Sequence, residues 1–99
     1  MTIKELQEVI RRTYYDKDSK RGPDLTFIWL VEEMGELAEA VRKRDREAVK
    51  REMSDLIAWT LSLANLLDID VEEAMERYAN GCPKCGSIPC KCEERLKGW

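Results

Sequence analysis

The fold of this chain is decided by residues 25–43, which read LTFIWLVEEMGELAEAVRK. This segment combines a helix-forming apolar pattern with four carboxylates inside residues 31–40. Its apolar side chains recur every three or four residues, as on one face of an α-helix: Phe27, Leu30, Met34, Leu37 and Val41. The pattern therefore predicts an amphipathic helix with an acidic edge.

The segment that follows predicts a second long helix, antiparallel to the first. Asp45 suits the N-cap position, and the apolar pattern continues to about residue 67. The side expected to be buried carries Met53, Leu56, Ile57, Thr60, Leu61, Ala64 and Leu67. The second half of this helix is apolar nearly all round, which is typical of a segment buried on more than one face.

Two shorter helices are predicted on either side of this hairpin. Thr2 and Glu5 have the spacing of a capping box and open a helix that reaches about residue 14. Asp70 and Glu73 repeat this spacing and open a helix that ends near residue 80. The fold class indicated by these patterns is all-α.

A charged segment, DKDSKRGPD at residues 16–24, separates the first predicted helix from the second. We interpret it as a turn-rich linker that is broken by Gly22-Pro23, with Asp24 as the next N-cap. After Gly81 the composition changes to a run of cysteines. We therefore predict a helical domain over residues 1–80 and a small metal-binding extension over residues 81–99.

The composition limits the classes of protein to consider. With 37% charged and 43% hydrophobic residues, the chain of 99 residues fits neither a disordered nor a membrane protein. Its first residues, MTIKELQEVIRR, are charged throughout and do not resemble a signal peptide, so we expect a cytoplasmic protein. The formal net charge of −3 argues against nucleic-acid binding, and the absence of histidine excludes histidine-based catalysis.

The acidic residues form two pairs with the same spacing. Glu33 and Glu36 are three residues apart in the first long helix, and so are Glu52 and Asp55 in the second. In an antiparallel hairpin these carboxylates can converge across the groove and bind a divalent cation. Oxygen ligands favour Mg²⁺, Mn²⁺ or Ca²⁺. The alternative is that both pairs lie on solvated helix faces, and the spacing alone leaves both interpretations open.

The motif Glu32-Glu33-x-x-Glu36, then fifteen residues, then Glu52-x-x-Asp55, resembles the signature of MazG-type all-α nucleoside triphosphate pyrophosphohydrolases. The resemblance extends over about residues 25–80. It implies a four-helix bundle and Mg²⁺-dependent cleavage of a nucleotide between its α and β phosphates, which yields a monophosphate and pyrophosphate. It also implies that Mg²⁺ is held by one set of carboxylates, Glu33, Glu36, Glu52 and Asp55. Glu32 would either support these ligands from behind or help to activate water.

The resemblance has consequences for assembly and for substrate binding. It implies homodimers, or homotetramers built as dimers of dimers, with active sites between helices of neighbouring subunits. The family often carries an asparagine and basic residues after the last helix, where they contact phosphates. Asn80 and Lys84 are the nearest matches, although the cysteine cluster begins at this point and departs from the family pattern.

Other side chains near the predicted groove have more than one interpretation. Trp29 and Trp59 each lie four residues from a proposed ligand; either could stack on a base, but this spacing more often belongs to a core or a subunit interface. A basic cluster at the helical turn could bind phosphates or simply complement a helix end: Lys43, Arg44, Arg46, Lys50 and Arg51.

Four cysteines lie within eleven residues, in the sequence CPKCGSIPCKC. The CPKCG element resembles the knuckle of zinc ribbons, and four thiolates suit a closed, structural Zn²⁺ site. The predicted ligands are Cys82, Cys85, Cys90 and Cys92. Disulfides or an iron site are the alternatives.

Two classes of function follow from these patterns. The first is a hydrolase of housecleaning type that acts on nucleoside triphosphates with Mg²⁺ as cofactor. The second is a non-catalytic helical dimer whose zinc knuckle binds nucleic acid or a protein partner. The acidic residues and the negative net charge favour the hydrolase.

Overall fold

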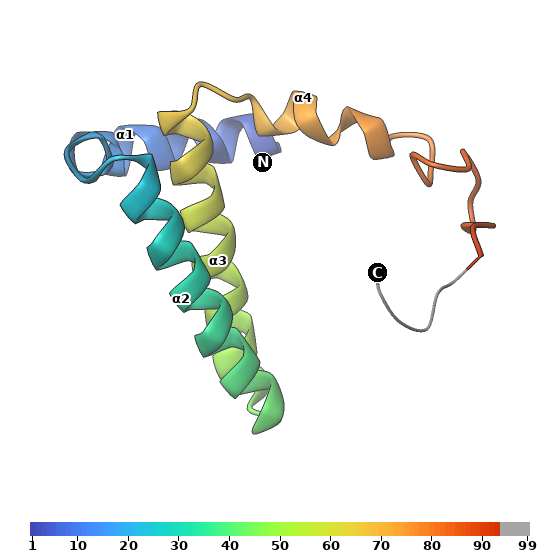
Figure 1. The fold of residues 1–99 in the computed structure, drawn as a ribbon, viewed down its shortest axis with the longest axis horizontal. Coiled ribbons are helices and arrows are strands. Elements are labelled where there is room, and N and C mark those ends of the chain that lie inside the picture. Colours follow the sequence, from blue (N-terminus) through green and yellow to red (C-terminus); the bar gives the residue numbers. More distant parts are fainter. Residues whose placement is uncertain (94–99) are drawn as a thin grey trace.

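The computed structural model describes residues 1–93 and is helical, with loops and no strand in that range. Its elements are α1 (Ile3–Arg21), α2 (Pro23–Arg42), α3 (Arg46–Leu66), α4 (Val71–Met75) and the 3₁₀ turn η1 (Glu76–Tyr78). Figure 1 shows α2 and α3 side by side as an antiparallel hairpin, with α1 lying across one end of it. The all-α fold class is thus confirmed.

The first helix is longer than the sequence pattern predicted. We expected it to end near residue 14 and residues 16–24 to form a linker, but α1 continues to Arg21. Lys20 and Arg21 in the last turn complement the helix dipole, so a dense run of charges is compatible with a helix here. The break is confined to Gly22, which has φ 86° and ends α1.

The start of α2 also differs from the prediction. Gly22, and not Asp24, occupies the N-cap, and Pro23 follows in the first helical positions. Proline is suited to this place because the first amide groups of a helix have no partner within the helix. Asp24 lies within the first turn, where its charge is favourable to the helix dipole.

The other predicted caps are confirmed. Thr2 and Glu5 form both hydrogen bonds of a capping box. Asp45 accepts a hydrogen bond from the Ala48 amide at 3.1 Å and opens α3. Asp70 caps α4 in the same way, but this helix is short and passes at Glu76 into η1 instead of continuing to residue 80.

A polar junction fixes the place where α4 leaves the body. The side-chain amide nitrogen of Gln7, on α1, donates to the Asn65 side chain at 3.0 Å and to the Ile69 carbonyl at 2.7 Å. The side-chain oxygen of Gln7 accepts a hydrogen bond from the backbone amide of Val71 at 2.9 Å. One glutamine therefore joins α1, the end of α3 and the start of α4, and α4 then leads away from the hairpin (Figure 1).

The core within one chain is small. Ala40, Leu61 and Ala64 are its buried hydrophobic residues, whereas Phe27 is 54% exposed and Met34 52% exposed. The less exposed edge of α2 is Thr26, Leu30, Glu33, Leu37 and Ala40, which differs from the predicted stripe. The radius of gyration is 15.9 Å, against roughly 13 Å for a compact chain of this length, so the chain is extended. Many of its large apolar side chains remain exposed.

Among the described residues, none of the helices combines the length and the apolar character that crossing a bilayer requires.

Candidate active site

The α2–α3 hairpin brings three of the predicted ligands together. Glu33 and Glu36 on α2 and Glu52 on α3 each place one carboxylate oxygen within 4.8 Å of the others. The helical spacing of three residues puts the first two on adjacent turns, and the antiparallel packing of α3 supplies the third. Asp55 lies outside this set of three, although it is close enough for its charge to act on Glu33.

The neighbouring carboxylates disfavour ionisation of Glu33. Burial raises the pKa of Glu33 to about 7, and a hydrogen bond with Glu36 and the charges of the neighbouring carboxylates act in the same direction. The Oε2 atoms of Glu33 and Glu52 are buried and have no hydrogen-bond partner among the described residues. Orphaned carboxylate oxygens that converge from two helices fit an oxygen-ligated divalent cation.

A hollow of ≈ 550 Å³ lies along this cluster, between α2 and α3. Glu32, Glu36 and Glu52 line it, so Glu32 lies on the same groove although it does not belong to the set of three. Lys43 lines the other end of the groove. Glu39 and Asp45 line the groove as well, and Lys43 lies 3.3 Å from Glu39. The groove is therefore mainly acidic, and its carboxylate oxygens can hold a metal ion.

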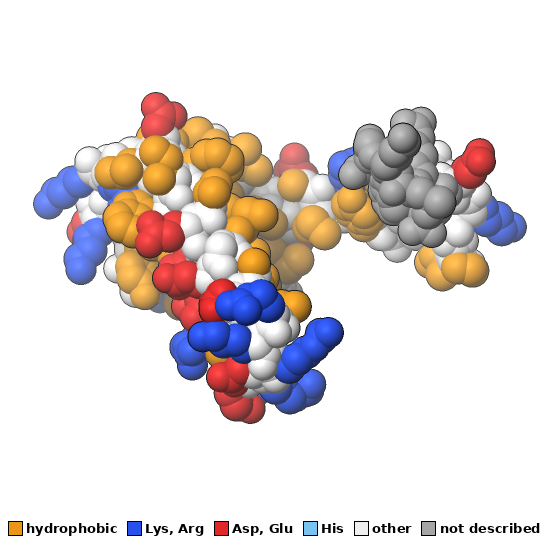
Figure 2. Space-filling model, turned by 60° about the horizontal axis from the view of Figure 1, so that its bottom comes forward, with side chains coloured by type: hydrophobic (Ala, Val, Ile, Leu, Met, Phe, Trp, Pro, Cys, Tyr) orange, Lys and Arg blue, Asp and Glu red, His pale blue; other side chains and the backbone are white. Residues whose placement is uncertain are grey.

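Basic side chains gather at the turn of the hairpin. Figure 2 shows this end, at the bottom of the view, covered by Lys and Arg next to a row of acidic side chains. Several of these cations already have acidic partners, since Arg42 and Lys43 lie 2.7 and 3.3 Å from Glu39. Arg51 lies 3.6 Å from Oε1 of Glu52, so only the second oxygen of Glu52 is unpartnered.

A second, smaller hollow of ≈ 230 Å³ adjoins Asp55. The Arg21 guanidinium stands over the ring of Trp59, 4.8 Å from its centroid, and donates to Asp18 at 2.8 Å. Trp59 stacks in turn with Trp29, with ring centroids 6.5 Å apart and an interplanar angle of 22°. The two tryptophans thus contact each other, but Trp29 remains 41% exposed, so neither the core or interface interpretation nor base stacking is decided within one chain.

The sequence analysis missed Asp18 and Arg21. Both residues were assigned to the predicted linker, whereas they belong to the last turn of α1 and line the hollow beside Asp55. Their opposite charges at a spacing of three residues were the available signal, because this spacing places two side chains on one helix face.

Two predicted substrate residues lie elsewhere. Asn80 and Lys84 follow η1, and α4 carries this part of the chain away from the hairpin (Figure 1). Neither residue lines the hollows at the carboxylates. Within a single chain they are not part of the groove. A further hollow, ≈ 790 Å³ between the start of α1 and the end of α3, is lined by none of the clustered carboxylates.

The four predicted cysteine ligands do converge. Their sulfur atoms lie within 4.8 Å of one another, and together they could hold a metal ion. Backbone amides of Lys91 and Ser87 lower the pKa of the Cys85 thiol to about 6, whereas hydrogen bonds with Cys90 and the other thiols raise the pKa of Cys92 to about 12. The two shifts differ in direction because backbone amides stabilise the Cys85 thiolate, whereas the neighbouring thiols favour the protonated form of Cys92.

Comparison with known proteins agrees with the site. The model of the MazG nucleotide pyrophosphohydrolase domain matches residues 21–84. A cyanophage S-2L protein named dATP/dGTP diphosphohydrolase is 36% identical over 74 residues, which cover 75% of this chain and 67% of the relative. A Bacillus subtilis (strain 168) protein named uncharacterized protein YpjD is 34% identical over 87 residues, with 77% and 78% of the two chains covered.

The fold and the carboxylate groove are those of an all-α nucleotide hydrolase. The chain belongs to the MazG nucleotide pyrophosphohydrolase family. It is therefore an enzyme, and the alternative of a non-catalytic helical module is not adopted. Members of this family typically depend on a metal ion, which agrees with the unpartnered oxygens of Glu33 and Glu52.

Proposed function

We propose that this protein is an Mg²⁺-dependent nucleoside triphosphate pyrophosphohydrolase that cleaves between the α and β phosphates. The observation that carries the proposal is the pair of buried, unpartnered oxygens on Glu33 of α2 and Glu52 of α3, two members of a group of three neighbouring carboxylates. The ligands in this proposal are Glu33, Glu36, Glu52 and Asp55.

Mg²⁺ is preferred because the donors are all oxygen and because one side of the groove is open. This ion rarely uses a cage made only of protein groups and usually completes its shell with water and substrate phosphates. When bound, it would neutralise phosphate charge and polarise the bond that is cleaved. The proposal also includes Zn²⁺ as a structural ion at the cysteines, at a separate site.

The residues of the groove have separate tasks in the proposed reaction. Water adds across the Pα–O–Pβ bridge, and the products are a nucleoside monophosphate and pyrophosphate. Glu32, on the rim of the groove, would accept the proton of the attacking water, since the chain has no histidine to do so. Lys43, at the other end, would attract the distal phosphates.

The substrate is proposed to be an NTP or dNTP of the housecleaning kind. The cyanophage relative is named for dATP and dGTP, so these purine deoxynucleotides are the first candidates here as well. Because such nucleotides occur in the cytoplasm, we place the enzyme there. Asn80 and Lys84 could contact the phosphates only from a second copy of the chain.

A homodimer or homotetramer is part of this proposal. Large apolar side chains on both hairpin helices are about half exposed, among them Phe27, Met34 and Ile57. Figure 2 shows hydrophobic side chains in an open band beside the acidic row. Burying this band against another copy would remove it from water and exclude solvent from the groove.

The test is product analysis by chromatography. The protein is incubated with each NTP and dNTP, with and without Mg²⁺, beside Glu36→Gln, Glu52→Gln and the control Glu47→Gln, which alters an exposed carboxylate in the first turn of α3. We expect monophosphate and pyrophosphate, dependence on Mg²⁺, and a loss of at least about 100-fold in the first two variants only. Release of single phosphate, or activity that survives both substitutions, would contradict the proposal.

A further inference from the structure

We propose that the four cysteines bind one Zn²⁺ ion in a closed tetrahedral site, and that this ion is what folds residues 81–92. The site is distinct from the carboxylate groove and from the proposed reaction. It is an addition to the helical hairpin and lies beyond η1, at the far end of the segment that α4 carries away from the body (Figure 1).

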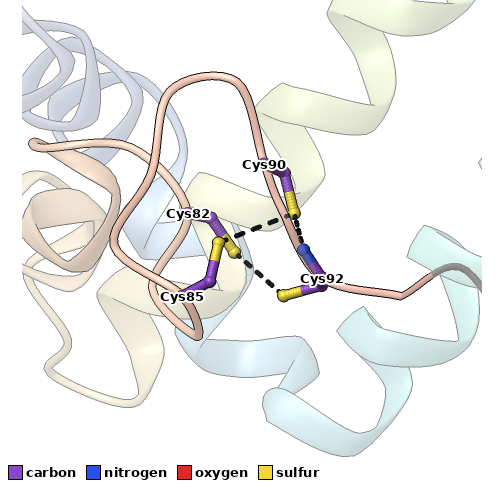
Figure 3. A group of neighbouring side chains, drawn as sticks. All are labelled: Cys82, Cys85, Cys90 and Cys92. Carbon is purple, nitrogen blue, oxygen red and sulfur yellow. Dashed lines mark hydrogen bonds between the residues drawn. The ribbon is translucent and has the colours of Figure 1, made fainter.

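The positions of the sulfur atoms carry this inference. The Cys82 and Cys92 sulfurs lie 3.8 Å apart, and those of Cys85 and Cys90 lie 3.9 Å apart, as two opposite edges of the cluster (Figure 3). Zn–S bonds of about 2.3 Å in a regular tetrahedron require sulfur separations of about 3.8 Å. A disulfide requires about 2.05 Å, and all four cysteines are free.

The backbone is shaped to present the sulfurs inward. The Cys82 amide donates to the Ser87 carbonyl at 3.1 Å, and the Gly86 amide donates to the Cys82 carbonyl at 2.7 Å, which closes a tight knuckle. Gly86 has φ 71°, a conformation that favours glycine. A Cβ at Gly81 would lie 2.8 Å from the Ser87 carbonyl oxygen, so this close approach also requires glycine.

Backbone amides also point at two of the sulfurs. The Lys91 amide lies 3.3 Å from the Cys85 sulfur, and the Cys92 amide lies 3.4 Å from the Cys90 sulfur (Figure 3 draws the second contact). Hydrogen bonds of this kind stabilise thiolates, which are the form that binds a metal. They also help to orient the Cys85 and Cys90 side chains as ligands.

The knuckle has no hydrophobic core that could fold it. No residue from Gly81 to Glu93 is buried, and Ile88, its one large apolar side chain, is 79% exposed. So short a segment needs a cross-link, such as a bound metal ion, to hold one conformation. Because all four coordination positions are filled by cysteine, the ion is structural and has no open position for a substrate.

The two sites should select different ions. Thiolates prefer soft or borderline ions such as Zn²⁺, whereas the carboxylates of the hairpin prefer hard ions such as Mg²⁺. The cysteine cluster contains no carboxylate, and the carboxylate cluster contains no cysteine. The same chain can therefore hold both ions at once without competition between the two sites.

Metal analysis of the full-length protein tests the inference. Protein purified under reducing conditions should contain about one zinc per chain, and the Cys85→Ser, Cys90→Ser double variant should contain almost none. A Ser87→Ala variant, altered inside the knuckle but not at a ligand, is the matched control and should keep its zinc. Replacement of the zinc by Co²⁺ should give the visible absorption of tetrahedral cobalt–thiolate coordination.

The structural part is tested by amide exchange. Removal of zinc should abolish protection in residues 81–92 and leave the protection of α2 and α3 unchanged. Iron in place of zinc, two disulfides in the freshly isolated protein, or a knuckle that remains protected without metal would each overturn the inference. None of these readouts depends on hydrolysis, so they can fail or succeed independently of the proposed enzymatic function.

Discussion

The Nη1 atom of Arg21 lies 2.8 Å from Oδ1 of Asp18, and the Asp18 side chain is only 4% exposed. The same guanidinium donates to the Thr26 hydroxyl at 3.2 Å and stands over the ring of Trp59. One ion pair thus joins the end of α1 to the first turn of α2 and to the middle of α3. It fixes the corner of the fold beside Asp55.

Removal of the buried acid from this pair should be costly. We expect Asp18→Ala to lower the free energy of unfolding by about 3 kcal/mol, the lower end of the range for a broken buried pair, because Arg21 keeps part of its side chain in solvent. Chemical denaturation followed by circular dichroism measures the change. The control Asp16→Ala, an exposed acid on the same helix, should change stability by less than about 0.5 kcal/mol. Equal effects of the two substitutions would show that the pair is not structural.

The metal-free protein should become less stable as the pH rises through the range in which Glu33 ionises. The pKa of Glu33 is raised from 4.5 to about 7 on folding, so between these values the folded state binds more protons than the unfolded state. The stability therefore falls with increasing pH in this window and levels off above about pH 7. Melting temperatures measured in the presence of EDTA report this change.

Glu33→Gln supplies the matched comparison for this effect. Between pH 4.5 and 7 the melting temperature of the wild type should fall relative to that of the variant, because only the wild type ionises at position 33. Mg²⁺ should raise the melting temperature of the wild type more at pH 8 than at pH 5. A pH-independent difference would mean that Glu33 is not the group that titrates.

The four proposed magnesium ligands should not contribute equally. Glu52 belongs to the group of three carboxylates, whereas Asp55 lies outside it and faces the hollow below Arg21. We expect Asp55→Asn to raise the Mg²⁺ concentration for half-maximal hydrolysis about tenfold, and Glu52→Gln to lower the hydrolysis rate at least about 100-fold at any Mg²⁺ concentration. Asp68→Asn, in the turn that follows α3, is the control. Identical Mg²⁺ titrations of Asp55→Asn and wild type would exclude Asp55 as a ligand.

The apolar band on the hairpin should mediate self-association. Phe27→Glu places a charge on a side chain of α2 that is 54% exposed in one chain, and in an oligomer this charge would be buried without a partner. We expect the variant to sediment as a monomer at micromolar concentration while the wild type does not. Ile3→Glu introduces the same charge at the start of α1 and should leave the assembly intact. A wild type that sediments as a monomer would refute the proposed oligomer.

Local patterns in the sequence determined much of this protein. The N-caps at Thr2, Asp45 and Asp70 were predicted correctly, since a cap is a contact between residues only three positions apart. The pairing of Glu33 with Glu36 follows from helical geometry alone. The clustering of the cysteines follows from their closeness in the sequence, since all four lie within eleven residues.

The tertiary structure decided what depends on distant neighbours. Residues 16–21 look like a linker because charge and turn composition carry no information about distant partners. In the structure Asp18 is buried, and Arg21 contacts Thr26 of α2 and Trp59 of α3, which favours a helix that continues to this point. Likewise, the apolar stripe of α2 did not reveal that its least exposed edge runs through Glu33. The burial that raises the pKa of this glutamate and leaves its Oε2 without a partner arises only when α3 packs alongside, because a helix by itself cannot remove a charge from water.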